Sequence, residues 1–150
     1  MSTYLDTGRG ANRLVASLDA AGHRLTGPRL AVAELVAARE GHFTAAELLV
    51  DADRAQPGIG RATVFRTLDL FTSLGFVERV DLPGGDHAYV ACDPVHHHHA
   101  ICTSCGRSTD VDDVGLGNVL AAIGRRSGFS VTAHRLEIFG LCSACSAERP

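Results

Sequence analysis

A run of metal-ligand residues near the middle of the chain constrains the fold more than any other feature. Four consecutive histidines, His96–His99, are followed by Cys102 and Cys105, so six candidate ligands fall within ten residues. A second C-x-x-C pair, Cys142 and Cys145, follows after 36 intervening residues. Four thiolates in two such pairs are the usual ligand set of a closed, tetrahedral structural zinc site. The alternative, a redox-active thiol pair, suits this arrangement less well.

The histidines are then available for other metal positions. We expect an extended segment over His96–Cys102, because apolar residues follow the histidine run. Successive side chains of a strand point to opposite faces of the sheet. His97 and His99 would therefore share one face, while His96 and His98 share the other. One strand could thus supply ligands to two separate metal sites.

Length and composition favour a folded protein with no membrane span. The chain has 150 residues, of which 45% are hydrophobic, and this is enough to bury a core in one domain or in two small ones. We find no run of about 18 apolar residues, and the N-terminal residues lack the basic and apolar regions of a signal peptide. We therefore expect a cytoplasmic protein, in which paired C-x-x-C motifs are more often metal ligands than disulfides. A net charge of −3 gives no global argument for nucleic-acid binding, so any basic surface must arise locally.

Amphipathic patterns in the first half of the chain predict four helices, over about residues 11–21, 27–39, 45–56 and 60–74. Residues 1–10 are expected to form a frayed terminus. Thr26 as N-cap and Pro28 in the first turn mark the start of the second helix. Thr44 with Glu47 three residues later is a capping box at the start of the third.

The fourth helix and the segment after it predict a winged helix. The helix carries apolar residues at helical spacing, and its outward side is expected to hold Arg61, Thr63, Arg66 and Thr67. Two strands are expected over residues 76–80 and 87–91, around a turn with Pro83 at its second and Gly84 at its third position. Arg61 and Arg66 would face the DNA major groove, with the hairpin as the wing. The alternative is that these arginines only form a solvated helix face.

The remaining chain predicts a small α/β lobe, with elements at residues 96–102 (strand), 109–111 (strand), 113–127 (helix) and 130–141 (strand). An exposed strand edge and the apolar side of the helix would favour pairing with a second copy. The expected fold class is therefore α+β (α/β in the broad sense). A winged-helix DNA-binding domain covers residues 1–92, a hinge lies at about 91–95, and a metal-binding dimerisation domain covers residues 93–150.

Several motifs together resemble the ferric-uptake-regulator superfamily over nearly the entire chain. They are Thr63–Leu68, the histidine run with Cys102-x-x-Cys105-Gly106, and His134 followed by Glu137-Ile138-Phe139-Gly140-x-Cys142-x-x-Cys145. The Glu-Ile-Phe-Gly segment and a cysteine just before the histidine run look most like the zinc-uptake branch. The resemblance implies a homodimeric, zinc-responsive transcriptional repressor. Such a protein binds double-stranded operator DNA when zinc is replete and controls zinc-uptake genes.

The resemblance also implies a regulatory zinc site in addition to the structural zinc at the four cysteines. Its ligands match Glu78, Cys92, His97 and His99, with glutamate where the family usually has aspartate. Two ligands come from the expected wing and two from the following strand, so metal binding would fix the angle between the domains. A thiolate, two imidazoles and a carboxylate favour tetrahedral zinc over an octahedral, oxygen-rich manganese site.

A further family site matches His96, His98 and His134, but the family's helix glutamate falls on Gly117. We expect either three imidazoles with water, or a substitute carboxylate, for which Asp113 one turn earlier on the same helix face is our candidate. Iron, nickel or manganese are candidate metals for this additional site. The alternative is that the site is weak or empty.

The resemblance places DNA contacts on the first helix pair and on the fourth helix. Arg24 matches the basic residue that the family aims at the minor groove, and Arg66 matches the arginine of the recognition helix, whose motif includes Thr63. Phe65 stands where the family usually has tyrosine. It keeps an apolar contact for thymine methyls but lacks the hydroxyl. Arg61 is expected to contact DNA because of its exposure alone.

Other functions stay open at this stage. Within the superfamily, the chain could sense iron, nickel or peroxide. A zinc enzyme could activate water at a three-histidine site with an open position, but no HExxH and no H-x-E pattern paired with C-x-x-C supports it. A zinc-buffering protein would have no use for the recognition helix. We therefore expect a regulator and not an enzyme.

Overall fold

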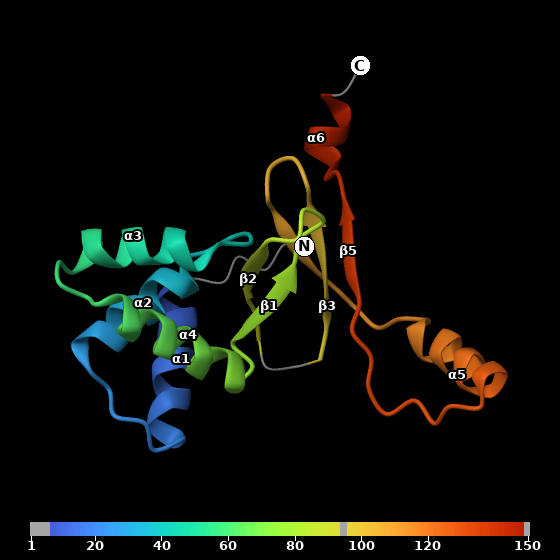
Figure 1. Cartoon of the computed structure of the whole chain (residues 1–150), viewed down its shortest axis with the longest axis horizontal. Coiled ribbons are helices and arrows are strands. Elements are labelled where there is room, and N and C mark those ends of the chain that lie inside the picture. Colours follow the sequence, from blue (N-terminus) through green and yellow to red (C-terminus); the bar gives the residue numbers. More distant parts are fainter. Residues whose placement is uncertain (1–6, 94–95, 149–150) are drawn as a thin grey trace. The chain divides into compact units, whose positions relative to one another are not determined.

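The chain folds into two compact units, Met1–Pro94 and Val95–Pro150 (Figure 1). The computed structural model describes residues 7–93 and 96–148. Residues 1–6 of the expected frayed terminus, and residues 94 and 95 of the expected hinge, therefore lie outside the described part. No described helix is both long enough and apolar enough to cross a bilayer.

The first unit is a group of helices followed by a two-stranded hairpin, as the sequence predicted. Its elements are α1 (Thr7–Ala20), α2 (Gly27–Ala37), α3 (Ala45–Ala55), α4 (Arg61–Ser73), β1 (Val77–Asp81) and β2 (His87–Ala91). The expectation of fraying is wrong for residues 7–10, which begin α1. Two glycines lower helix propensity there, but the helix is anchored further along by the buried Leu14 and Leu18.

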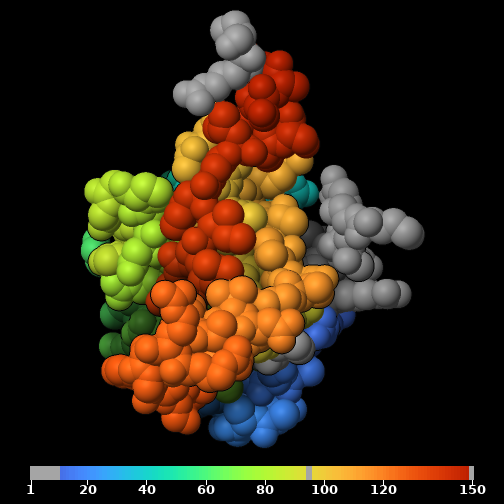
Figure 2. Space-filling view, turned by 90° about the vertical axis from the view of Figure 1, so that its right-hand side faces the viewer, coloured from blue at the N-terminus to red at the C-terminus, as the bar shows by residue number. Residues whose placement is uncertain are grey.

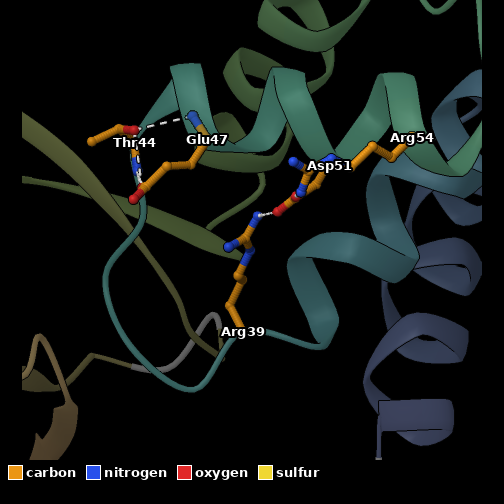
Figure 3. A network of polar contacts seen from close by, with 5 residues as sticks. All are labelled: Arg39, Thr44, Glu47, Asp51 and Arg54. Atoms are coloured by element: carbon orange, nitrogen blue, oxygen red, sulfur yellow. Dashed lines mark hydrogen bonds and ion pairs between the residues drawn. The ribbon is translucent and has the colours of Figure 1, made fainter.

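The starts of α2 and α3 follow the predicted capping signals. The Thr26 hydroxyl accepts a hydrogen bond from the Arg29 amide at 3.5 Å. In the capping box of α3, the Glu47 amide donates to the Thr44 hydroxyl at 3.1 Å, and the Thr44 amide donates to the Glu47 carboxylate at 2.7 Å (Figure 3). Hydrogen bonds from Thr44, first from its amide, lower the pKa of Glu47.

Helix α4 buries one side in the core of the first unit and exposes the other. Val64, Leu68 and Phe71 are fully buried, and Arg66 is exposed. The expectation that Thr67 faces outward is wrong, because Thr67 is buried with the apolar residues. Its hydroxyl donates to the Thr63 carbonyl at 2.7 Å, so the polar group is satisfied within the helix.

The wing is an antiparallel hairpin in which Glu78 of β1 lies opposite Val90 of β2. The Gly85 amide donates to the Leu82 carbonyl at 2.9 Å and closes the predicted turn. Gly85 has a φ of 87°, a conformation that favours glycine. The hairpin is attached to the helices through a β-bridge between Phe43 and Tyr89.

The second unit is a three-stranded sheet with two helices. Its elements are β3 (His98–Cys102), β4 (Ser108–Val111), α5 (Leu116–Ser127), β5 (Glu137–Gly140) and α6 (Ser143–Ala147). Strand β3 is central, antiparallel to β4 and parallel to β5. The ordered chain between β4 and β5 includes α5, which supplies the crossover that a parallel pair requires.

Two predicted strands are shorter than expected. The strand expected over 130–141 is confirmed only for Glu137–Gly140, which pair with residues 99–102 of β3. Residues 130–135 have no strand residue opposite them, because in the parallel register of His99 with Glu137 they correspond to residues before the start of β3. The strand expected from His96 begins at His98, which pairs with Val111, the last residue of β4.

Helix α5 also starts later than expected. The helix predicted from about Asp113 begins at Leu116, because Gly115 adopts a left-handed conformation with a φ of 83° at the N-cap. The Leu116 amide donates to the Asp113 carbonyl at 3.1 Å, so Asp113 lies in the turn before the helix.

The second unit carries exposed apolar side chains on α5, in the loop after it and on β5, segments that are orange to red in Figure 2. They include Val119, Ile123, Phe129, Val131, Leu136 and Ile138. Phe129 is 75% exposed. The expected strand edge and apolar helix side are therefore both present.

Candidate metal and DNA-binding sites

The four cysteines of the two C-x-x-C pairs lie together in the second unit. Their sulfur atoms are all within 4.8 Å of one another. Cys102 ends β3 and Cys105 lies in the turn after it, whereas Cys142 and Cys145 lie at the start of α6. The parallel pairing of β3 with β5 ends at Cys102 opposite Gly140, and this register places the two C-x-x-C pairs side by side. All four cysteines are free thiols, a set that fits tetrahedral zinc.

Backbone amides favour the thiolate form within this cluster. The amides of Cys105 and then Cys142 donate hydrogen bonds that lower the pKa of Cys102 to about 6. The Cys142 amide lies 3.3 Å from the Cys102 sulfur. The pKa of Cys142 is also lowered, mainly by the Cys145 amide. Because a metal binds the thiolate, these amides prepare Cys102 and Cys142 for a cation.

A second cluster brings together His96, His98, His134 and Asp113. Their ligand atoms all lie within 4.8 Å of one another. The Nε2 atom of His134 lies 3.0 Å from Nε2 of His96 and 3.1 Å from Nε2 of His98. The Asp113 carboxylate lies 2.9 Å from Nε2 of His98 and 3.4 Å from Nε2 of His134. Three imidazole nitrogens that converge on one carboxylate form a ligand set that a divalent cation can fill.

Asp113 reaches this cluster from a loop and not from the helix. The expected position one turn before Gly117 on the same helix face is wrong, since α5 begins only at Leu116. Gly117 has open space around it, and no carboxylate can come from that position. A hydrogen bond with His98, followed by the charge of His134, lowers the pKa of Asp113. The carboxylate is therefore held ionised beside the imidazoles.

The predicted regulatory ligands occur as two pairs. In the first unit, a carboxylate oxygen of Glu78 lies within 4.8 Å of the Cys92 sulfur. Cys92 directly follows β2, where its amide donates to the Phe76 carbonyl at 3.0 Å. In the second unit, the rings of His97 and His99 are edge to face, with centroids 4.7 Å apart. The expected sharing of faces along the histidine run is confirmed in that unit.

The sequence interpretation missed one carboxylate next to the second pair. Asp110 lies directly opposite His99 in the β3–β4 ladder. Its Oδ1 atom is 3.5 Å from Nδ1 of His99 and 3.9 Å from Nε2 of His97. The signal was the short turn after Cys102, which sets the register of the hairpin and so the residue opposite His99.

The residues expected to contact DNA all belong to the first unit. They are Arg24, Arg61, Thr63, Phe65 and Arg66. The three arginines are exposed, and the side chains of Thr63 and Phe65 are half-buried. The Arg24 carbonyl accepts a hydrogen bond from the Arg29 guanidinium at 2.7 Å, which ties the segment before α2 to that helix. The Arg61 guanidinium stacks on the Phe65 ring.

Comparison with known proteins identifies the family. The model of the ferric uptake regulator family matches residues 20–139. The chain belongs to the ferric uptake regulator family. The zinc uptake regulation protein of Mycobacterium tuberculosis is 37% identical over 128 residues, which cover 85% of this chain and 98% of that protein. The ferric uptake regulation protein of Legionella pneumophila is 33% identical over 126 residues, or 83% and 93% of the two chains.

Solved structures of this family also match the fold. A zinc uptake regulator complexed with zinc and DNA superposes with a TM-score of 0.77 at 28% identity, covering 95% of this chain and 96% of that one. The predicted resemblance and the predicted fold class are therefore confirmed. Relatives named for zinc and for iron both occur among the similar family members, so the ligand set of this ferric uptake regulator family member must identify its own metal.

Proposed function

We propose that this chain is a zinc-responsive transcriptional repressor that acts as a homodimer on double-stranded operator DNA. The observation that carries the proposal is the combination of a winged-helix unit with clustered thiol and imidazole ligands in one family member. It would act in the cytoplasm, control zinc-uptake genes and have no catalytic role. The relative named as a zinc uptake regulation protein and the solved zinc–DNA complex of a zinc uptake regulator support this function.

The cluster of Cys102, Cys105, Cys142 and Cys145 is the proposed structural zinc site. A bound zinc would join the end of β3 to α6 and so close the second unit. Structural zinc in small modules contributes on the order of 10 kcal/mol to folding. The second unit would then present α5 and β5 to a second copy. The exposed apolar side chains on these elements support that partner.

The proposed sensing site consists of Glu78, Cys92, His97 and His99. One pair of ligands belongs to each unit, so the site is complete only at certain angles between the units. Metal binding would add its free energy to those angles alone, and a ligand shifts an equilibrium only by such a difference in affinity. One thiolate and two imidazoles favour zinc over the harder cations. Asp110 would orient His99 as an outer partner, as carboxylates often do for metal-bound imidazoles.

The cluster of His96, His98, His134 and Asp113 is the proposed additional site. With one carboxylate and three imidazoles it would take zinc, and iron, nickel or manganese are the other candidates. All four residues belong to the second unit, so this site would stabilise that unit without directly depending on the angle between the units. We propose that it adjusts the zinc response and does not switch it on.

A metal titration of operator binding tests this function. Purified dimer would be stripped with a chelator that leaves the four-cysteine zinc in place, and its metal content measured. Operator binding is then followed against buffered free zinc, ferrous iron, nickel and manganese. The proposal expects tight binding with zinc at the lowest free-metal concentration. Binding that responds to iron and not to zinc would reassign the chain to an iron sensor, and binding without any metal would exclude a metal switch.

A further inference from the structure

Arg61 and Phe65 form a cation–π pair at the start of α4. Arg61 is the first residue of the helix, and Phe65 follows one turn later beside the buried Val64. The guanidinium carbon of Arg61 lies 5.1 Å from the centroid of the Phe65 ring, within the range of a cation–π contact. Arg61 is exposed and Phe65 is half-buried, so the pair lies at the surface of the first unit.

The charge of Arg61 has no acidic partner among residues 7–93 and 96–148. Three other arginines of the same unit do have such a partner, since Arg39 and Arg54 contact Asp51, and Arg13 contacts Asp93 at 3.0 Å (Figure 3 shows the Asp51 network). A guanidinium in a cation–π contact can still use its N–H groups as hydrogen-bond donors. Arg61 is exposed, so these donors are accessible at the surface of the first unit.

An ordered guanidinium fork matches one particular feature of DNA. Guanine offers the O6 and N7 acceptors side by side in the major groove, and arginine binds them in a bidentate manner. Stacking before binding reduces the side-chain entropy that this contact would otherwise cost. The free edge of the Phe65 ring is apolar and matches the methyl group of thymine.

The spacing of the pair limits which bases it can read together. Side chains one turn apart on a helix have Cβ atoms about 5–6 Å apart. Successive nucleotides on a strand rise by about 3.4 Å. Two groups at this separation therefore reach bases that are neighbours or are separated by one base pair.

We infer that Arg61 reads a guanine in the operator and that Phe65 positions the Arg61 guanidinium while contacting a thymine methyl within two base pairs. The inference rests on the proposed operator binding, and it names the base pattern that α4 selects. Phe65 is here a positioning residue for Arg61 and a direct contact for thymine. Arg61 thereby becomes a determinant of sequence specificity.

Selection of binding sites from a randomised duplex library, with zinc-loaded full-length dimer, tests the inference. The selected site and each of its single-base substitutions would then be titrated at one fixed salt concentration. Wild type should require a guanine with a thymine within two base pairs. Arg61→Lys keeps the charge and loses the planar fork. It should weaken this guanine preference and bind the selected site on the order of 10-fold more weakly, because a lysine ammonium can still donate to guanine but lacks the planar fork, while binding random DNA almost unchanged.

Variants of Phe65 separate positioning from a general structural effect. Phe65→Leu should lose the same guanine preference together with the thymine preference. In the Phe65→Leu background, Arg61→Lys should weaken operator binding by little more. Phe65→Tyr keeps the ring and should restore the guanine preference. Arg54→Lys is the matched control, because Arg54 is an exposed arginine of the same unit with an acidic partner, and its site preference should equal that of wild type.

Three results would overturn the inference. The first is a guanine preference that stays intact in Arg61→Lys. The second is Arg61→Leu weakening the binding of specific and random DNA by the same factor, as loss of a phosphate contact would. The third is a full guanine preference in Phe65→Leu. A wild-type dimer that binds no DNA with zinc would remove the proposed function as well. If wild type binds its operator with zinc and the Arg61 variants keep the same base preferences, the inference is wrong and the proposed function stands.

Discussion

The two units of the chain bury their side chains to very different extents. In the first unit, fourteen residues from α1 to β1 form one buried hydrophobic cluster. In the described part of the second unit, Ile101 and Cys102 are the buried apolar side chains, while Val114 is 89% and Phe129 75% exposed. The first unit can thus be held by hydrophobic burial. The second has little core of its own and needs other sources of stability, for which we propose zinc and a second copy.

Breaking the four-cysteine cluster should have the largest effect and should act on the second unit alone. We expect Cys102→Ser to lose the tightly bound zinc and to unfold or monomerise that unit, because structural zinc contributes on the order of 10 kcal/mol to folding. Zinc content, sedimentation and hydrogen exchange of residues 96–148 would measure this. Cys92→Ser is the matched control and should keep the zinc that resists chelation, the dimer and the exchange protection of residues 96–148. A Cys102→Ser protein that stays dimeric with its zinc would show that the cluster is not structural.

A cavity in the first unit should produce the opposite pattern. Leu48 is fully buried on α3, and Leu48→Ala should lower the free energy of unfolding of the first unit by about 2–5 kcal/mol. The zinc at the cysteine cluster should remain. Val50 on the same helix is 50% exposed, so Val50→Ala should change stability by less than about 0.5 kcal/mol. Urea denaturation combined with a zinc assay distinguishes the two units. If Leu48→Ala and Val50→Ala lower the free energy of unfolding equally, burial of Leu48 does not stabilise the first unit.

The proposed sensing site, with one ligand pair in each unit, should affect operator binding differently from the proposed additional site, whose ligands all belong to one unit. We expect Cys92→Ala to abolish zinc-induced operator binding and to leave the dimer and the cysteine zinc intact. His98→Ala removes a ligand of the additional site and should shift the required free zinc by about tenfold, without eliminating repression. Titration of operator binding against buffered zinc measures both. If Cys92→Ala responds like wild type while His98→Ala is inactive, the two sites have been assigned in reverse.

The capping box of α3 should give the smallest effect and one with a defined pH dependence. Thr44→Ala should cost about 0.5–2 kcal/mol. Because the pKa of Glu47 is lowered in the folded chain, its stabilisation is complete above the unfolded pKa and is lost as pH falls through the folded one. The free energies of unfolding of wild type and Glu47→Gln should therefore converge between about pH 5 and pH 3, because the Thr44 amide then faces an uncharged side chain in both proteins. If the difference in free energy of unfolding between the two proteins does not change with pH, the Glu47 carboxylate does not contribute to stability.

Local signals predicted the first unit well. Thr26, Thr44 and Glu47 mark helix starts because a side chain and an amide within three residues make each cap. The exception is Thr67, which is buried although it is polar. A threonine hydroxyl can bond its own helix, so polarity alone did not place it.

The additional site shows where local signals were insufficient. The sequence identified Asp113 as the substitute carboxylate but placed it on the helix. Gly115 has the left-handed conformation that delays α5, and the resulting turn brings the carboxylate to His98. Asp110 was missed for a related reason, because only the register of β3 with β4 brings it opposite His99.

The sequence by itself determined the ligand types, the family and the helical first unit. C-x-x-C spacing, strand alternation and capping are properties of residues close together in the chain, so they can be recognised without a structure. Only the tertiary structure decided which of these residues meet. The parallel register of β3 with β5 brings residues 102 and 142 together, and the loop before α5 brings Asp113 to the histidines. Such contacts depend on strand register and turn geometry over distances along the chain that local sequence patterns do not encode.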